Sequence, residues 1–346
     1  SPQELLGVTA LTLPAAAQRW VQQNAPEGYG PDQGAHYFDK LSLRSSFSAE
    51  DEYLLLEGVG TFCHGHEDTN AILRLTWKNR AWLADGDYIR AAPKFHNSLV
   101  VQRDGVGVLE TPGEGVVIPP LAILTTQRDD DDWGLVGSEA AGYNGVDWRR
   151  NLIWRKGRYI AVVDELHCRE SGEFHCRCLW RVVGDVMADV GQVRLHQDGA
   201  ELFLLHADDS TREIVEDDGG PWSGYLHHAG AVHVVHQKIA ARLQTGESLT
   251  FLHVFTPHQR VKIERWGPAL LRITDGEETT VVGARAGAPV AMEAGDAPAA
   301  EVIVGRPTKT AAPISDSAGR TQPLWEHDLD VGTVGPIATI EPASRP

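Results

Sequence analysis

Short apolar runs separated by two-residue turn signals restrict most strongly how this chain can fold. Lys-Asn, Asp-Gly or Lys-Gly pairs stand at 78–79, 104–105, 156–157, 198–199 and 275–276. Asn, Asp and Gly tolerate the positive φ of the tight turns that join antiparallel strands. Hardly any helical period follows residue 30. The pattern predicts an all-β protein with a large antiparallel β-sandwich rather than alternating strands and helices.

The expected strands flank these turns or form longer apolar runs. They are 53–58, 71–77, 80–85, 98–102, 106–109, 152–155, 159–163, 177–183, 193–196, 201–205, 232–242, 248–255, 270–273 and 279–282. Pro14 marks the first turn of a short helix over 15–23. After about residue 283, only 301–304 and 337–340 are strand-like. We therefore divide the chain into an N-terminal helix and linker (1–40), a β-sandwich (41–260) and a small C-terminal β-rich region (261–346).

Composition excludes two classes of partner. The chain has 31 Lys and Arg against 48 Asp and Glu, a formal net charge of −17, which argues against nucleic-acid binding. No run reaches the roughly 18 apolar residues of a membrane span. We therefore expect neither nucleic acid nor membrane as a partner. Four cysteines are too few for a disulfide scaffold, so buried free thiols are expected.

Ionisable residues are concentrated in Cys-His-Gly-His-Glu-Asp-Thr-Asn at 63–70, just after a predicted strand. If the backbone stays extended there, His64, His66, Asp68 and Asn70 share one face. Two imidazoles two residues apart on a strand can both reach one metal ion or one substrate.

A strand, a tight turn and a returning strand bring residue 85 back near residue 66, and His96 precedes the next strand. His66, Asp85 and His96 could then supply three ligands of a tetrahedral Zn²⁺, with water or another group in the fourth position. In the alternative interpretation, Asp85 only caps the turn and His96 only packs at the start of a strand. The residues by themselves leave both interpretations open.

Five motifs, in this order and spacing, resemble the heparinase II/III-like C-terminal β-sandwich of polysaccharide lyases. They are Leu-Arg-Ser-Ser at 43–46, Asp-Glu-Tyr-Leu-Leu-Leu at 51–56, His-Gly-His-Glu-Asp-Thr-Asn at 64–70, Leu-Ala-Asp-Gly-Asp-Tyr at 83–88 and His-Asn-Ser-Leu-Val-Val at 96–101. The run 150–165 is similar to later strands of the same domain.

The resemblance implies a lyase that cleaves uronic-acid polysaccharides by β-elimination, with an N-terminal α/α toroid facing the sandwich across a cleft. It implies a structural Zn²⁺ on His66, Asp85 and His96. It also places His64 beside the scissile sugar, as a proton-transfer group or as a neutralising partner for the uronate carboxylate. Abstraction of a proton alpha to a carboxylate needs such neutralisation, a base, and an acid for the leaving oxygen.

Three further residues complete the expected site. Tyr88 offers a phenol as a second candidate catalytic group. Asn70 lies on the polar face of the motif, and Arg150 belongs to the densest basic cluster, 149–158. We expect Asn70 and Arg150 to contact an anionic polysaccharide or oligosaccharide.

Residues 1–40 are too short for a toroid. We expect that domain on a longer precursor or on a separate chain, and a periplasmic or secreted location. Two other functions stay open at this point. One is a non-catalytic carbohydrate-binding or assembly module, and the other is a metal-dependent hydrolase or cupin-like enzyme with an open zinc position.

Overall fold

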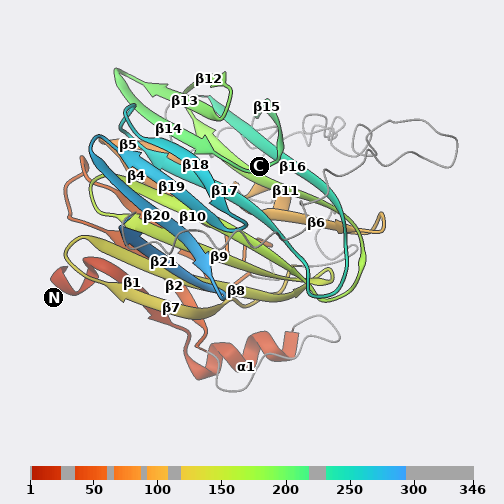
Figure 1. Ribbon diagram of the computed structural model, residues 1–346. Coiled ribbons are helices and arrows are strands. Elements are labelled where there is room, and N and C mark those ends of the chain that lie inside the picture. Colours follow the sequence, from red (N-terminus) through yellow and green to blue (C-terminus); the bar gives the residue numbers. More distant parts are fainter. Residues whose placement is uncertain are drawn as a thin grey trace, which may run out of the picture.

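The computed structural model describes residues 2–24, 36–60, 66–86, 92–107, 118–217 and 231–293. Two large antiparallel sheets face each other, and a smaller third sheet lies against one of them (Figure 1). The predicted all-β sandwich is therefore confirmed.

The first sheet has nine strands and carries the segments of interest. Its main path runs in the order β1 (Gly7–Thr12), β2 (Phe38–Arg44), β3 (Tyr53–Glu57), β4 (Ile72–Trp77), β5 (Arg80–Ala84), β11 (Gly172–Val183), β16 (Val232–Leu243) and β15 (Thr211–Asp217). Another strand, β6 (Leu99–Arg103), also pairs with β11. Because β11 pairs with both β5 and β6, the end of β5 and the start of β6 meet at this strand.

The second sheet has eight strands, and its two faces are both covered. Its order is β12 (Asp185–Asp189), β13 (Gln192–Gln197), β14 (Ala200–His206), β17 (Ser248–Thr256), β10 (Tyr159–Cys168), β9 (Val146–Arg155), β8 (Trp133–Tyr143) and β7 (Ile123–Asp129). One hydrophobic core fills the space between the two large sheets. Another core lies between the second sheet and the third. As a result β10 is buried along nearly its whole length instead of alternating.

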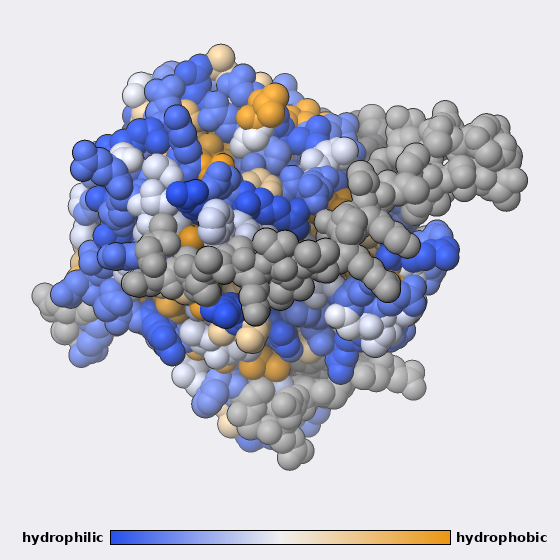
Figure 2. Space-filling model, in the orientation of Figure 1, coloured by the Kyte–Doolittle hydropathy of each residue, from blue (hydrophilic) through white to orange (hydrophobic). Residues whose placement is uncertain are grey.

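The third sheet is a meander that follows the sandwich in the chain. It consists of β18 (Lys262–Gly267), β19 (Leu270–Asp275), β20 (Glu278–Arg285) and β21 (Ala288–Glu293). In Figure 1 these strands lie in front of the sandwich, and the described surface in that view is mainly hydrophilic (Figure 2). The strand-like runs expected at 301–304 and 337–340 lie outside the described residues.

The turn signals formed hairpins as predicted. Lys78 and Asn79 both have positive φ, as do Asp198 and Gly199, which is the geometry of a primed turn. At Asp104-Gly105 the turn is present and Val106 bridges Arg103. The remainder of the strand expected at 106–109 is outside the described residues from 108 onward.

The N-terminal segment differs from the expectation of a helix and linker. The helix α1 (Ala15–Asn24) begins directly after Pro14, as predicted. Ahead of it, however, a 3₁₀ helix η1 (Pro2–Leu5) leads into β1, which pairs with β2 and forms an edge of the first sheet. None of the helices in the described ranges is long and apolar enough to cross a membrane. Cys168, Cys176 and Cys178 are buried free thiols, as expected, and Cys63 lies outside the described residues.

A candidate metal group at the meeting of three strands

Four side chains, His66, Asp68, Asp85 and His96, form a group that we call the metal group. Each offers one ligand atom, and these atoms all lie within 4.8 Å of one another. His96 Nδ1 lies 2.9 Å from Asp85 Oδ1. His66 Nδ1 lies 3.8 Å from a carboxylate oxygen of Asp68 and 3.8 Å from one of Asp85. The expected convergence of His66, Asp85 and His96 is therefore present in the fold.

The strand connections explain this convergence. Asp85 directly follows β5, and His96 follows the 3₁₀ helix η2 (Pro93–Phe95) just before β6. A Cβ atom on Gly86 would lie 2.3 Å from the carbonyl oxygen of Phe95. Only glycine lets the segments that carry Asp85 and His96 approach this closely without a backbone shift.

Asn97 holds these segments in register. Its side-chain amide donates to the carbonyl of Ile72 at 2.8 Å and to that of Ala84 at 3.2 Å. Its side-chain oxygen accepts the backbone N–H of Arg181 at 2.7 Å. One fully buried side chain thus links β4, β5 and β11 next to His96. This explains structurally why a histidine and an asparagine are adjacent here.

Arg150, on β9 of the second sheet, reaches through the core to the same place. It donates to the carbonyl of Asn70 at 2.8 Å and to that of Asn97 at 3.0 Å. On its other side Nε and Nη2 contact the carboxylate of Asp164 at 2.8 and 3.1 Å. The side chains of Arg150 and Asp164 are both fully buried. Arg150 therefore fastens the backbone on both sides of the metal group to the opposite sheet.

The four ionisable groups of the metal group shift one another's pKa. Burial, with the nearby carboxylates of Asp85 and Glu57, raises the pKa of Asp68 to about 7 against the opposing effect of His96. Burial also acts to raise the pKa of Asp85, but His96 and His66 outweigh it and lower that pKa. The pKa of His96 is raised because attraction to Asp85 outweighs burial. Carboxylate oxygens together with imidazole nitrogens are a donor set that Zn²⁺ accepts.

Asp68 is the member of the metal group that the three-ligand prediction did not include. The alternation of side chains in the motif puts Asp68 on the same face as His66, so the sequence contained the pattern needed to predict it. The backbone does not continue extended to the end of the motif, which is a correction. Asn70 has φ of 65° and lies in a turn, because the chain bends there to enter β4. His66 and Asp68 nevertheless point to one place.

The remaining predicted residues have different positions. His64 and Tyr88 lie outside the described residues. Asn70 is fully buried, and its side-chain oxygen accepts a hydrogen bond from Ser138. Arg150 is also fully buried, with the internal partners given above. Contact of Asn70 or Arg150 with substrate stays a prediction, whereas their support of the metal group is visible.

A second group with metal-binding residue types lies in the core. Ligand atoms of Asp164, Cys178 and His253 also lie within 4.8 Å of one another. The carboxylate of Asp164, however, already accepts bonds from Arg150 and from Trp148 Nε1 at 2.8 Å. Burial raises the pKa of Cys178 well above its usual value, which disfavours the thiolate a metal needs. This group is a hydrogen-bonded polar core.

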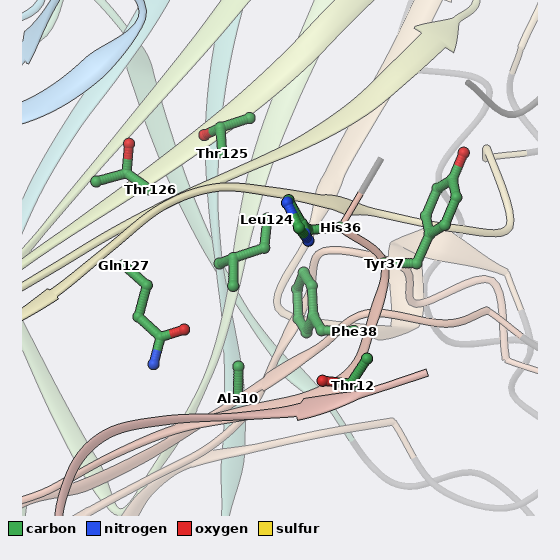
Figure 3. Close-up of a pocket in the computed structure, with 9 residues that line it drawn as sticks. All are labelled: Ala10, Thr12, His36, Tyr37, Phe38, Leu124, Thr125, Thr126 and Gln127. Carbon is green, nitrogen blue, oxygen red and sulfur yellow. The ribbon is translucent and has the colours of Figure 1, made fainter. Parts of the chain in front are cut away.

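A cavity of about 340 Å³ lies apart from both groups, between β1, the start of β2 and β7. In Figure 3 Phe38 and Leu124 point towards each other, whereas Tyr37 points away from the other labelled side chains. The described residues that line the cavity include His36 and Tyr37 but no carboxylate and no thiol. It therefore offers no acid–base pair comparable to the metal group.

Known structures share this fold. Heparan sulfate lyase HepC from Pedobacter heparinus is 15% identical with a TM-score of 0.55, and the match covers 78% of this chain and 45% of that one. A crystal structure of heparinase III is 12% identical with a TM-score of 0.52, over 84% of this chain and 52% of that one. This chain thus spans about half the length of these structures.

Sequence comparison gives the family directly. No curated protein sequence matches this chain. Residues 58–264, which contain the whole metal group, match the family described as heparinase II/III-like, C-terminal. Because this match spans more than half of the sequence, the chain belongs to the heparinase II/III-like C-terminal family.

Proposed function

We propose that this chain is the sandwich part of a polysaccharide lyase that cleaves a uronic-acid-containing polysaccharide by β-elimination. The observation that carries the proposal is the metal group, built from the histidine and aspartate motifs within a heparinase II/III-like domain. The similar solved structures include a heparan sulfate lyase, which supports an acidic polysaccharide as the substrate class. A helical toroid, on a longer precursor or a separate chain, would supply the other wall of the cleft.

In this proposal a base removes the proton alpha to the uronate carboxylate, a carbon–carbon double bond forms, and the glycosidic oxygen leaves with a proton. His64 transfers a proton or neutralises the carboxylate, and Tyr88 is the second candidate for proton transfer. Asn70 and Arg150 are the proposed substrate contacts. The proposed location is periplasmic or secreted.

His66, Asp68, Asp85 and His96 would hold Zn²⁺, which would fix the two segments that carry them. Four protein donors close a tetrahedral site, which is typical of structural zinc. A hydrolase would need an open position for water, so the fourth donor argues against a metal-dependent hydrolase.

The test combines metal content with product formation. We expect about one zinc per chain, and a lower melting temperature for His66→Ala than for the matched control His196→Ala, whose imidazole lies on β13 away from the group. The complete enzyme should convert uronate polysaccharides into unsaturated products that absorb in the ultraviolet. The His64→Ala variant should lose this activity.

The results separate the proposal from its main alternative. Absence of metal, together with an unchanged melting temperature of His66→Ala, would refute the zinc site. Binding of acidic glycans by the complete protein without unsaturated products would instead identify a carbohydrate-binding or assembly module.

A further inference from the structure

Two edge strands of the sandwich, one from each large sheet, are both irregular where they line the same cavity. β1 ends the first sheet and β7 ends the second. The pairing of β1 with β2 shifts register between Ala10 and Thr12, and that of β7 with β8 shifts between Leu124 and Thr126. All four residues line the cavity of about 340 Å³. Such β-bulges bend a strand locally and are common at sheet edges and next to active sites.

Hydrogen bonds between the two sheets hold this cavity open. Gln127 Nε2 on β7 donates to the carbonyl of Val8 on β1 at 3.0 Å. The backbone N–H of Leu124 donates to the carbonyl of His36, just before β2, at 2.8 Å. In Figure 3 the side chains of Thr126 and Gln127 lie on one side of the cavity, and those of Ala10 and Thr12 lie on the other. The cavity is therefore formed by the fold itself, as is usual for small-molecule sites.

The lining residues determine which kind of ligand fits. No Asp, Glu, Lys or Arg is among the described residues that line the cavity. Its polar groups include the hydroxyl of Thr12, the imidazole of His36 and the carboxamide oxygen of Gln127, and its apolar groups include Ala10, Phe38 and Leu124. A charged ligand finds no counter-ion here. A ligand with hydroxyl groups finds donors and acceptors, together with an apolar wall for its C–H groups.

An extended peptide is the other ligand that a sheet edge commonly binds, through regular backbone pairing. Here the bulges interrupt the ladder on both edge strands. Gln127 also occupies the carbonyl of Val8 that such a peptide would use. The volume of about 340 Å³ lies near the lower end of the range of roughly 300–1,000 Å³ that small-molecule pockets have. These features favour a small ligand over a strand.

We propose that this cavity binds a small uncharged ligand with several hydroxyl groups, about the size of a mono- or disaccharide. The side chains of Thr12, His36 and Gln127 bond to its hydroxyl groups, and Ala10 and Leu124 contact its C–H groups. The site goes beyond the proposed function, because it lies apart from the metal group and requires no acidic group on the ligand.

Binding is measured calorimetrically with the complete protein, and the probes are glucose, maltose and cellobiose. Ala10→Leu places additional methyl groups in the cavity, so we expect it to weaken binding by about tenfold or more. Thr12→Val keeps the shape of the side chain and removes one hydrogen bond, so we expect a loss of about twofold to tenfold. The matched control is Thr76→Val on β4, which does not line the cavity and should bind like the wild type.

A readout on the wild-type protein avoids dependence on the folding of a variant. The imidazole NMR signal of His36, identified by its loss in His36→Gln, should shift with at least one of the three sugars. A peptide of alternating threonine and valine should leave the signal unchanged. If the peptide shifts the His36 signal and no sugar does, the site pairs with strands and the proposal is wrong.

The outcomes also separate this inference from the proposed function. If no sugar binds or shifts His36 at about 50 mM, well above a millimolar Kd, the proposal is refuted whether or not the complete enzyme forms unsaturated products. Binding of a sugar to Ala10→Leu as tightly as to the wild type would refute it too. If Ala10→Leu does not fold, Thr12→Val and the His36 signal decide the question. Ala10→Leu and Thr12→Val should leave the formation of unsaturated products unchanged.

Discussion

The metal group and the polar core group look alike in residue type but differ in how their charges are balanced. Each brings carboxylate and imidazole groups together with ligand atoms within 4.8 Å. In the core group, Arg150 donates hydrogen bonds to both carboxylate oxygens of Asp164. The negative charge of Asp164 is therefore already balanced, and a metal cation would gain little by binding there. In the metal group, Asp68 and Asp85 remain close together, and the pKa of Asp68 rises to about 7 chiefly through burial. The balance of charge, more than the residue types, distinguishes the candidate metal group from the core group.

The largest expected effect comes from removing the arginine that neutralises the core group. Arg150→Leu leaves Asp164 buried without its charged partner, so we expect a loss of about 3–5 kcal/mol in the free energy of unfolding. Denaturant titration measures this. Arg194→Leu, which breaks a partly exposed pair, should cost less than about 1 kcal/mol. Arg150→Leu combined with Asp164→Leu should recover part of the loss, and failure to recover any would mean that the bonds to Asn70 and Asn97 dominate.

Removing a bound metal should lower the stability of the protein through the metal group and not through the core group. If the free metal concentration is about 100 times its Kd, a chelator should lower the free energy of unfolding by about 2.7 kcal/mol. Thermal unfolding with and without chelator measures this. His96→Ala should remove the response, whereas His253→Gln should retain it together with the full metal content. Loss of metal from His253→Gln would mean that the ion sits in the core group.

The fourth donor gives a smaller effect. Asp68→Asn should weaken metal binding by at least about tenfold, since it removes one anionic ligand. In the metal-free protein the same change should not destabilise, because it removes a buried charge that lies near Asp85 and Glu57. Competition with a fluorescent chelator measures affinity, and denaturant titration measures stability. Unchanged affinity would assign Asp68 to a supporting role only.

Acid should destabilise through the core group. Burial lowers the pKa of His253 to about 3. Below the unfolded-state pKa of about 6.5, the unfolded chain binds a proton that the folded chain does not, so stability falls as pH falls. The cost is about 1.4 kcal/mol per pH unit between roughly 6.5 and 3. The wild type should thus lose more stability from pH 6.5 to 5.5 than His253→Gln does, measured by urea titration at each pH. Equal losses would refute this assignment.

Most interior strands of the two large sheets were predictable from the sequence, and the strands at the sheet edges were not. The residues of the turns, such as Lys78-Asn79 and Asp198-Gly199, predict the strands that these turns join. The strands that were missed include β1, β7, β12 and β15, which lie at sheet edges and carry much polar or exposed sequence. Interior β8 was missed for another reason, since its Gly and Ala residues weaken the apolar alternation.

The site was predictable where motif and topology agree. His66, Asp85 and His96 could be placed together because a hairpin returns the chain by a known geometry. The support from Arg150 could not be predicted, because its partners Asn70 and Asn97 lie in connections just before strands of the other sheet and are distant in sequence. The sequence identifies Arg150 only as a member of the basic cluster 149–158, and only tertiary packing shows that its side chain is buried in the core.

The bonds from Arg150 to Asn70 and Asn97 also have a kinetic consequence. The metal group spans only residues 66–96, but Asn70 and Asn97 within and beside it are bonded to an arginine on the opposing sheet. A metal bound at this group would therefore reach full affinity only once the two sheets are docked, and we expect docking to come late in the folding of a sandwich rich in contacts between distant residues. Interactions that form after the transition state slow unfolding and leave the folding rate nearly unchanged. A bound metal should thus lengthen the lifetime of the native sandwich.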